Sequence, residues 1–222
     1  MLVQWPVPIV VSRGALVPLG VFALLFVAFS GGSKPSVLAA AAVLGGVGGV
    51  VSLIVHELGH VSIARKLSGV RPEKVSVMCL GAAAHLDGSY RNGREQARMA
   101  LGGPEASFAF ALALTVPLFL PAPTSLKIGA LGLALLNVGI GALSLLPVHP
   151  LHKLVVGLVW WAVGSEARAR RIIKRVGMGL LAVDFTMVVI MLAERPVLGA
   201  SVAAVAAVAY GQKHLVRTLH RA

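Results

Sequence analysis

Residues 51–64 read VSLIVHELGHVSIA, an apolar run that is interrupted by two histidines and a glutamate. His56 and His60 are four residues apart, so on a helix they lie on one face and can hold one Zn²⁺ between their imidazoles. Glu57 follows His56 directly and can act as general base toward a water at that metal. Since such groups are costly within hydrocarbon, they indicate metal-assisted hydrolysis inside a membrane.

The composition places the chain among polytopic membrane proteins. Mean hydropathy is +0.88, and 57% of the residues are hydrophobic while 13% are charged. A length of 222 residues supplies about six spans of ~20 residues with short loops. The single cysteine, Cys79, excludes an internal disulfide.

The order of apolar and polar segments predicts an all-α polytopic fold with about six transmembrane helices. Pro147 and Pro150 should break the fourth segment. In the polar stretch 68–97, alternating runs predict a small β-hairpin that turns at Gly81, between the second and third helices. The six apolar segments are roughly 15–30, 36–66, 98–120, 126–163, 176–193 and 196–212.

We interpret residues 1–222 as a single transmembrane domain. The metal-binding core extends over about 37–163. Accessory helices are expected at about 8–30 and 176–216.

The basic residues predict the orientation of the chain in the membrane. Of the 20 Lys and Arg residues, 17 fall at the N-terminus, in 65–98, in 153–175 or in the C-terminal tail. Lys and Arg favour cytoplasmic loops, so we expect a multi-pass cell-membrane protein with both termini in the cytoplasm. The net charge of +12 is explained by these cytoplasmic basic residues. We therefore expect no nucleic-acid partner. The three remaining basic residues are Lys34, Lys127 and Arg195.

This topology gives the depth of the metal site. His60 lies five residues before Arg65. At 1.5 Å per residue, the metal is expected roughly 5–15 Å inside the cytoplasmic boundary. The active site therefore faces the cytoplasmic side, from which water must reach it.

A catalytic zinc needs a third protein ligand besides the two histidines. The soluble metzincin pattern would place glycine at 63 and histidine at 66, but Ile63 and Lys66 stand there, so that class is excluded.

Two further motifs lie in the apolar segments that follow. Residues 103–107 read Gly-Pro-Glu-Ala-Ser. Asn137 is followed, after six residues, by 144–153, which read SLLPVHPLHK. Together with the motif at 56–60, these resemble the site-2 protease family of intramembrane zinc metalloproteases, in its compact bacterial type without a PDZ domain. The resemblance covers about 37–163.

The resemblance implies the third ligand, with a departure from the family pattern. The family has Gly-Pro-x-x-Asn in the first motif, and Ser107 stands here in place of its Asn. In the second motif the family has Asn-x-x-Pro-x-x-Pro-Leu-Asp-Gly; here Ser144 replaces the Asn, His152 the Asp and Lys153 the Gly. His152 then takes the place of the aspartate that binds zinc, and three-histidine zinc sites are well attested.

Two other histidines remain possible as ligands. His149 lies three residues before His152, although the register with the family favours His152. His85 precedes an Asp87-Gly88 pair that has the character of a turn and lacks the proline framework around it.

The resemblance also implies a substrate-binding or oxyanion role for Asn137 and Ser144. They are two helical turns apart and can share a face. The alternative, an interhelical hydrogen bond alone, is equally consistent with the sequence. We place Glu105, beside Pro104, at a helix start, where exposed amides favour a carboxylate.

In function, the resemblance implies regulated intramembrane proteolysis with one Zn²⁺ per chain. Its partners would be the lipid bilayer and a single-span membrane protein substrate, such as an anti-sigma factor. The hairpin at 75–86 could pair with an unwound substrate as an added strand. The sequence leaves two alternatives open, an inactive relative that binds membrane segments and a metal transporter. It does not give the oligomeric state.

Overall fold

A computed structural model describes residues 7–31, 34–79, 81–145 and 153–175. The chain divides into two compact units, Met1–Arg170 and Arg171–Ala222, and the elements named here all belong to the first. They are β1 (Ile9–Val11), a 3₁₀ turn η1 (Arg13–Ala15), α1 (Leu16–Phe29), α2 (Pro35–Ala64), β2 (Val70–Met78), β3 (Gly81–Gly88), α3 (Gly93–Leu114), α4 (Val116–Phe119), α5 (Thr124–Leu145) and α6 (Lys153–Val163).

The helices have the length and composition of membrane spans. Within the described residues, Pro35–Ala64, Gly93–Phe119 and Thr124–Leu145 are long and apolar enough to cross a membrane, and Arg13–Phe29 and Leu154–Val163 are shorter apolar helices. The prediction of a helical, polytopic membrane fold is thereby confirmed. The predicted spans at 176–193 and 196–212, and the predicted break at the two prolines 147 and 150, lie outside the described residues.

The third helix begins earlier than the sequence predicts. The side chain of Asn92 accepts a hydrogen bond from the Glu95 amide at 2.9 Å, and the Glu95 carboxylate accepts one from the Arg91 amide at 3.0 Å. This reciprocal cap starts α3 at Gly93 and not at residue 98. Consequently Glu105 and the proline before it lie in the middle of α3, and the expectation that they begin a helix is wrong.

The glycines of α2 allow tight packing against α1. A Cβ at Gly45 or Gly49 would meet the rings of Phe26 or Phe22 at 2.5 Å or less. These aromatic side chains of α1 therefore occupy the space that side chains on α2 would fill. The helices approach closely there, as small residues in membrane helices permit.

A second close approach joins α2 to α3. A Cβ at Gly59 would meet the backbone of Gly102, and one at Gly102 would lie 2.6 Å from the Gly59 carbonyl oxygen. The two backbones are therefore in direct contact at this level. Since the level is one residue from His60, the contact fixes α3 beside the histidine motif.

A small sheet lies on the last part of α2. Its strand order is β1-β2-β3, with β1 parallel to β2 and β3 antiparallel to β2. The predicted hairpin is confirmed, and Gly81 has the positive φ of 121° that its position after the turn requires. β1 was not predicted; its three residues fall in a segment that we assigned to an accessory helix.

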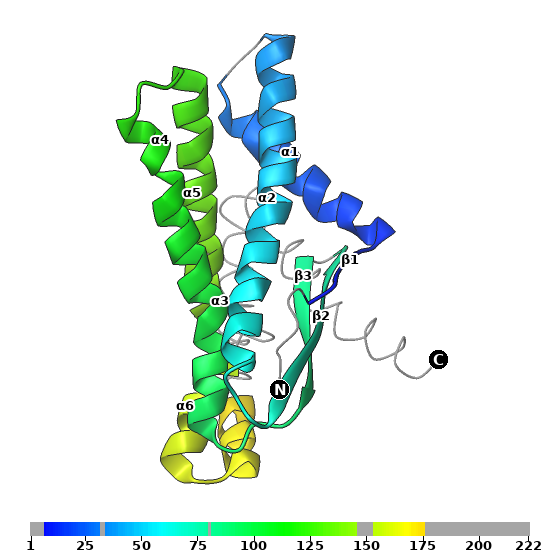
Figure 1. The fold of residues 1–222 in the computed structure, drawn as a ribbon, viewed down its shortest axis with the longest axis vertical. Coiled ribbons are helices and arrows are strands. Elements are labelled where there is room, and N and C mark those ends of the chain that lie inside the picture. Colours follow the sequence, from blue (N-terminus) through cyan, green and yellow to red (C-terminus); the bar gives the residue numbers. More distant parts are fainter. Residues whose placement is uncertain (1–6, 32–33, 80, 146–152, 176–222) are drawn as a thin grey trace, which may run out of the picture. The chain divides into compact units, whose positions relative to one another are not determined.

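The sheet is held to α2 by an apolar contact. Val61 of α2 and Val75 of β2 are fully buried together with Val7, and Leu58 and Ala84 pack against them. Figure 1 shows the sheet beside the half of α2 in which that helix ends, with α3 along the other side of the helix. The sheet and α3 thus flank the histidine motif.

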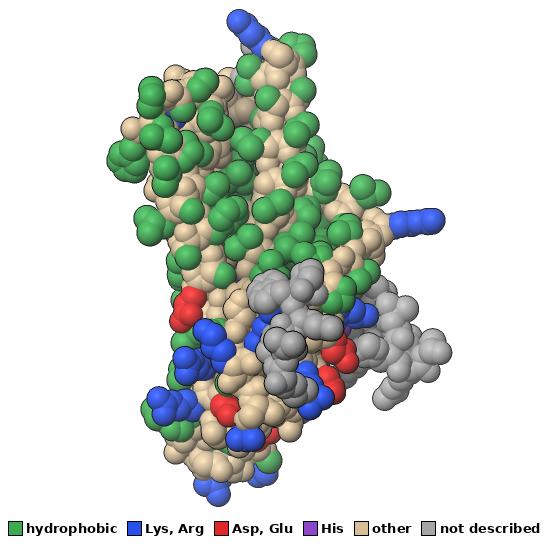
Figure 2. Space-filling view, viewed as in Figure 1, with side chains coloured by type: hydrophobic (Ala, Val, Ile, Leu, Met, Phe, Trp, Pro, Cys, Tyr) green, Lys and Arg blue, Asp and Glu red, His purple; other side chains and the backbone are tan. Residues whose placement is uncertain are grey.

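Charge and apolar surface separate along the helices of this unit. Hydrophobic side chains cover most of the visible helical surface in Figure 2, while most of the Lys and Arg side chains gather near the sheet and the end of α2. Clusters of Lys and Arg are typical of a membrane boundary. Here the cluster lies at the same end of the helices as the motif at 56–60.

The contact between α2 and α3 gives a prediction for stability. Gly59→Ala should lower the free energy of unfolding by roughly 1–3 kcal/mol, because its Cβ forces the two backbones apart. Thermal unfolding of the purified chain in detergent measures the change. Gly20→Ala is the matched control, since a Cβ at Gly20 has nothing within 4 Å. Equal stability of the two variants would contradict the contact.

Candidate metal centre

Three side chains of one helical turn form the candidate metal centre. His56, Glu57 and His60 each offer a ligand atom, and these atoms lie within 4.8 Å of one another. The imidazole rings of the two histidines meet edge to face, with centroids 5.0 Å apart. His56 is buried, while Glu57 and His60 are partly accessible. The spacing expected from the sequence therefore brings the three groups together.

The backbone of α3 determines which nitrogen of His60 is available to a metal. The Nδ1 atom lies 2.8 Å from the carbonyl oxygen of Met99. A carbonyl oxygen only accepts, so Nδ1 carries the proton and donates it. The longer approach of the Gly103 amide to the same nitrogen, 3.3 Å, is then no hydrogen bond. The lone pair of His60 is left on Nε2.

A serine plays the same part for His56. The Nδ1 atom of His56 lies 2.9 Å from Oγ of Ser107, which is completely buried. The hydroxyl can accept from Nδ1–H, and in that tautomer Nε2 carries the lone pair that binds a metal. Sequence reasoning quoted Ser107 within a motif but gave it no role. The replacement of the family asparagine by another hydrogen-bonding residue was the available signal.

Gly103 of α3 packs directly against the two imidazoles. A Cβ placed on Gly103 would lie 2.5 Å from Nε2 of His56 and still closer to Nε2 of His60. Gly103 therefore packs directly against both rings, and a larger residue would displace them. The two imidazole nitrogens and the Glu57 carboxylate, whose ligand atoms lie within 4.8 Å of one another, fit a zinc ion chemically.

The glutamate is attached to the sheet. Oε2 of Glu57 accepts a hydrogen bond from the backbone amide of Ala84, at 2.7 Å. The carboxylate thus lies between the histidines and strand β3. This contact was not anticipated, because a main-chain amide carries no signature in the sequence.

The two predicted polar residues of α5 occupy different positions. Oγ of Ser144 lies 3.4 Å from Nε2 of His56 and donates to the Ile140 carbonyl at 2.7 Å, so it is next to the metal-binding atoms. Asn137 is completely buried, and its amide donates to Oγ of Ser52 at 2.8 Å. Its Oδ1 atom has no hydrogen-bond partner among the described residues. Asn137 therefore joins α5 to α2 one helical turn before His56.

The remaining histidines lie elsewhere or outside the described residues. Nε2 of His85 is 2.6 Å from Oγ of Ser76, across the hairpin, and His85 is not in the metal-binding group of the described residues. His149 and His152 lie outside the described residues, so the third ligand stays a prediction.

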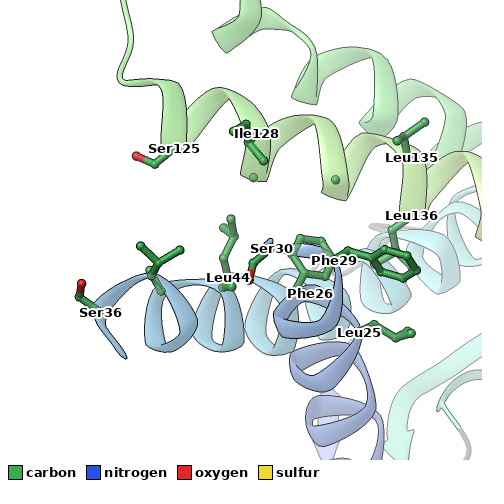
Figure 3. Close-up of a pocket in the computed structure, with 15 residues that line it drawn as sticks. Leu25, Phe26, Phe29, Ser30, Ser36, Leu44, Ser125, Ile128, Leu135 and Leu136 are labelled. Atoms are coloured by element: carbon green, nitrogen blue, oxygen red, sulfur yellow. The ribbon is translucent and has the colours of Figure 1, made fainter. Parts of the chain in front are cut away.

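A large apolar pocket in this unit is separate from the metal centre. It has a volume of about 770 Å³ and lies between α1, α2 and α5. Figure 3 shows its wall of apolar side chains, with Ser36 and Ser125 at the starts of α2 and α5. The pocket residue of α2 that is nearest to His56 in sequence is Leu44, and twelve residues of helix separate them by about 18 Å.

Comparisons with known proteins agree with this arrangement. No family model matches the chain. A putative zinc metalloprotease of Mycobacterium tuberculosis, Rip3, is 34% identical over 135 residues, which is 56% of this chain and 34% of that protein. A zinc metalloprotease of Methanocaldococcus jannaschii is 32% identical over 102 residues, covering 46% of this chain and 29% of the other.

Among solved structures, the site-2 protease from Methanocaldococcus jannaschii superimposes with a TM-score of 0.61. The match covers 96% of this chain and 93% of the other, at 20% identity. The chain has the site-2 protease fold. The resemblance to the site-2 protease family, drawn from three motifs, is confirmed. The chain spans about a third of the length of the curated relatives it matches.

The close packing of Gly103 against both imidazoles gives a prediction for metal binding. Gly103→Ala should lower the zinc content well below one per chain, because its Cβ overlaps the Nε2 atoms of His56 and His60 and displaces the rings. Metal content of the purified protein measures this. Gly139→Ala on α5 is the control, since a Cβ there meets nothing within 4 Å. Full zinc occupancy in Gly103→Ala would contradict this packing.

Proposed function

We propose that the chain is an intramembrane zinc metalloprotease that hydrolyses a peptide bond in or near the transmembrane segment of a single-span membrane protein. The proximity of two imidazole nitrogens and a carboxylate, all within 4.8 Å of one another, carries this proposal. The group lies in a helix that is long and apolar enough to cross a membrane. The similarity to two zinc metalloproteases and the site-2 protease fold support it.

His56, His60 and His152 would hold the zinc. The hydrogen bonds from Nδ1 of the first two histidines orient their rings, as partners of metal-binding histidines do. His152 is proposed from the register of its proline motif with the family. When bound, zinc polarises the scissile carbonyl and lowers the pKa of water.

Glu57 is the general base of the proposed reaction. Its carboxylate takes a proton from the attacking water and delivers it to the nitrogen of the leaving amine. Ser144 lies beside Nε2 of His56 and donates to the Ile140 carbonyl; a rotation of its hydroxyl away from that carbonyl would let it donate to the developing oxyanion. Asn137 supports the same site by tying α5 to α2 through Ser52.

We propose that β3 presents the substrate as an extended strand. The central strand β2 already has β1 on one side and β3 on the other, so the part of the hairpin that remains for pairing is β3. The hydrogen bond from the Ala84 amide to Glu57 supports this, because the outer edge of β3 then faces the carboxylate proposed as general base. Strand addition would supply the extended conformation that proteases require.

The orientation and substrate class follow from the charges and the family. We propose that both termini lie in the cytoplasm and that the active site opens toward that side, because Lys and Arg gather near the end of α2. The substrate is a single-span membrane protein such as an anti-sigma factor, cut in a regulated manner. The chain would act on its segment within the bilayer.

The role of Glu57 gives a prediction for catalysis. Glu57→Ala should lower cleavage of a single-span substrate by about 10²–10⁴-fold, because it removes the general base. Zinc content should stay at one per chain, since the histidines remain. Cleavage of a panel of single-span membrane proteins in detergent measures the effect, and Glu73→Ala, at an exposed carboxylate of β2, is the control.

The outcomes separate the candidate functions. Zinc in both proteins with cleavage only by wild type supports the protease. Zinc in both, without cleavage by either, indicates an inactive relative that binds membrane segments. A folded protein without zinc would contradict the metal centre itself.

The third ligand gives a prediction of its own. His152→Ala should lose most of the bound zinc, because two imidazoles alone hold the ion weakly. His149→Ala and His85→Ala should keep it, since neither is proposed as a ligand. Zinc stoichiometry of the three purified variants decides. Full binding by His152→Ala together with loss in His85→Ala would assign the third position to His85.

A further inference from the structure

We propose that the outer edge of β3 holds the carboxylate of Glu57 through the Ala84 amide, and that a substrate strand releases it by taking that amide. This inference rests on the proposed function and names a device at the same site. The observed contact is the hydrogen bond of 2.7 Å from the Ala84 amide to Oε2 of Glu57. Pairing of a substrate strand with β3 would then remove a hydrogen bond from the catalytic carboxylate.

The register of the sheet explains why this amide points outward. Val75 faces Ala84 across the β2–β3 pair, and the amide of Val75 donates to the Pro8 carbonyl, on the side of β1. Val75 therefore directs its hydrogen bonds away from β3. In an antiparallel pair its partner must do the same, so Ala84 directs its amide and its carbonyl away from β2.

Ala82 is the equivalent residue one step along the strand. It faces Val77, whose carbonyl accepts from the Ser12 amide on the other side of β2. The Ala82 amide therefore also points to the outer edge of β3. The two amides lie on the same edge of β3, and Glu57 accepts from that of Ala84. Ala82 can therefore serve as the matched control for Ala84.

A single amide hydrogen cannot serve a carboxylate and a substrate carbonyl equally well. A strand added to the outer edge of β3 has to accept a hydrogen bond from every outward amide in its register. Ala84 lies in the middle of β3, so an added strand that covers the edge reaches it. The added strand and Glu57 therefore compete for one donor.

The competition selects for unwound substrates. A helical membrane segment uses its carbonyls within the helix and has none to offer the Ala84 amide. An extended segment offers several carbonyls at strand spacing. The hydrogen bonds that these form with β3 together outweigh the hydrogen bond from the Ala84 amide to the carboxylate. The general base is thus retained by β3 until an extended peptide lies beside it.

Two inactive variants test the competition without any cleavage of the probe. Glu57→Gln keeps an oxygen that accepts from the Ala84 amide, while Glu57→Ala removes it. The probe is a short, lysine-flanked, fluorescein-labelled peptide of alternating valine and threonine, added to the zinc-loaded full chain in lipid nanodiscs. Glu57→Ala should bind this probe about fivefold more tightly than Glu57→Gln, as expected for one competing hydrogen bond.

Proline substitutions on the edge show whether the effect belongs to the Ala84 amide. Proline is tolerated on an edge strand where the amide faces outward. In an Ala84→Pro background the two Glu57 variants should bind the probe equally, because there is no amide to compete for. In an Ala82→Pro background the fivefold difference should persist.

Amide exchange tests the contact itself, without substrate or proline. In protein labelled with ¹⁵N-alanine, the Ala84 amide should exchange faster in Glu57→Ala than in Glu57→Gln, while the Ala82 amide is unchanged. Equal exchange of the Ala84 amide in the two variants would overturn the inference. Equal probe affinity, or no probe binding, would overturn it as well. Cleavage of single-span substrates by the wild type tests the proposed protease function separately. A negative result for the Ala84 contact or for probe binding therefore does not decide whether the protein is a protease.

Discussion

The direct contact of the α2 and α3 backbones at Gly59 and Gly102 is the constraint on which the metal centre depends. It places α3 close enough for Met99 and Ser107, eight residues apart, to meet the two histidines. A side chain at either glycine would move these acceptors away from the imidazoles. The metal-binding nitrogens are therefore oriented by a helix crossing, and not by the motif alone.

The same crossing explains why a glycine stands at position 103. The residue after the contact lies against the Nε2 atoms of both histidines, and any side chain there would displace the rings. Helix α3 thus supplies two hydrogen-bond acceptors and the close-packed surface between them. Pro104 lies inside this helix, eleven residues after its start at Gly93.

The local patterns of the sequence predicted much of the fold. The motif at 56–60, its apolar helix and the alternating hairpin are features of neighbouring residues, and the structure contains each of them. Strand β1 was missed because three residues are too few for a periodic signal and because its partner, Val75, lies far along the chain. The start of α3 was missed because its first turn is polar and falls outside the apolar segment.

Spacing alone predicted the candidate site only where its parts are close in sequence; Ser144, 88 residues from His56, was named only through the resemblance to the family motif. His56, Glu57 and His60 follow from spacing alone. Ser107 and the Ala84 amide lie 51 and 27 residues from the groups they contact. Only the crossing of α2 with α3 and the docking of the sheet bring them there, and neither leaves a periodic pattern. Asn137 shows the converse, since its motif was recognised but its contact with Ser52 depends on the packing of α5.

The bond between Glu57 and the Ala84 amide has a consequence for the resting protein as well. An open strand edge is a template on which a second chain can pair, and membranes hold many such chains in a small area. A charged acceptor in the middle of β3 occupies one amide of that edge, so an adventitious strand must first displace it. The Glu57 carboxylate therefore makes unwanted pairing between chains less favourable without closing the edge to an extended segment.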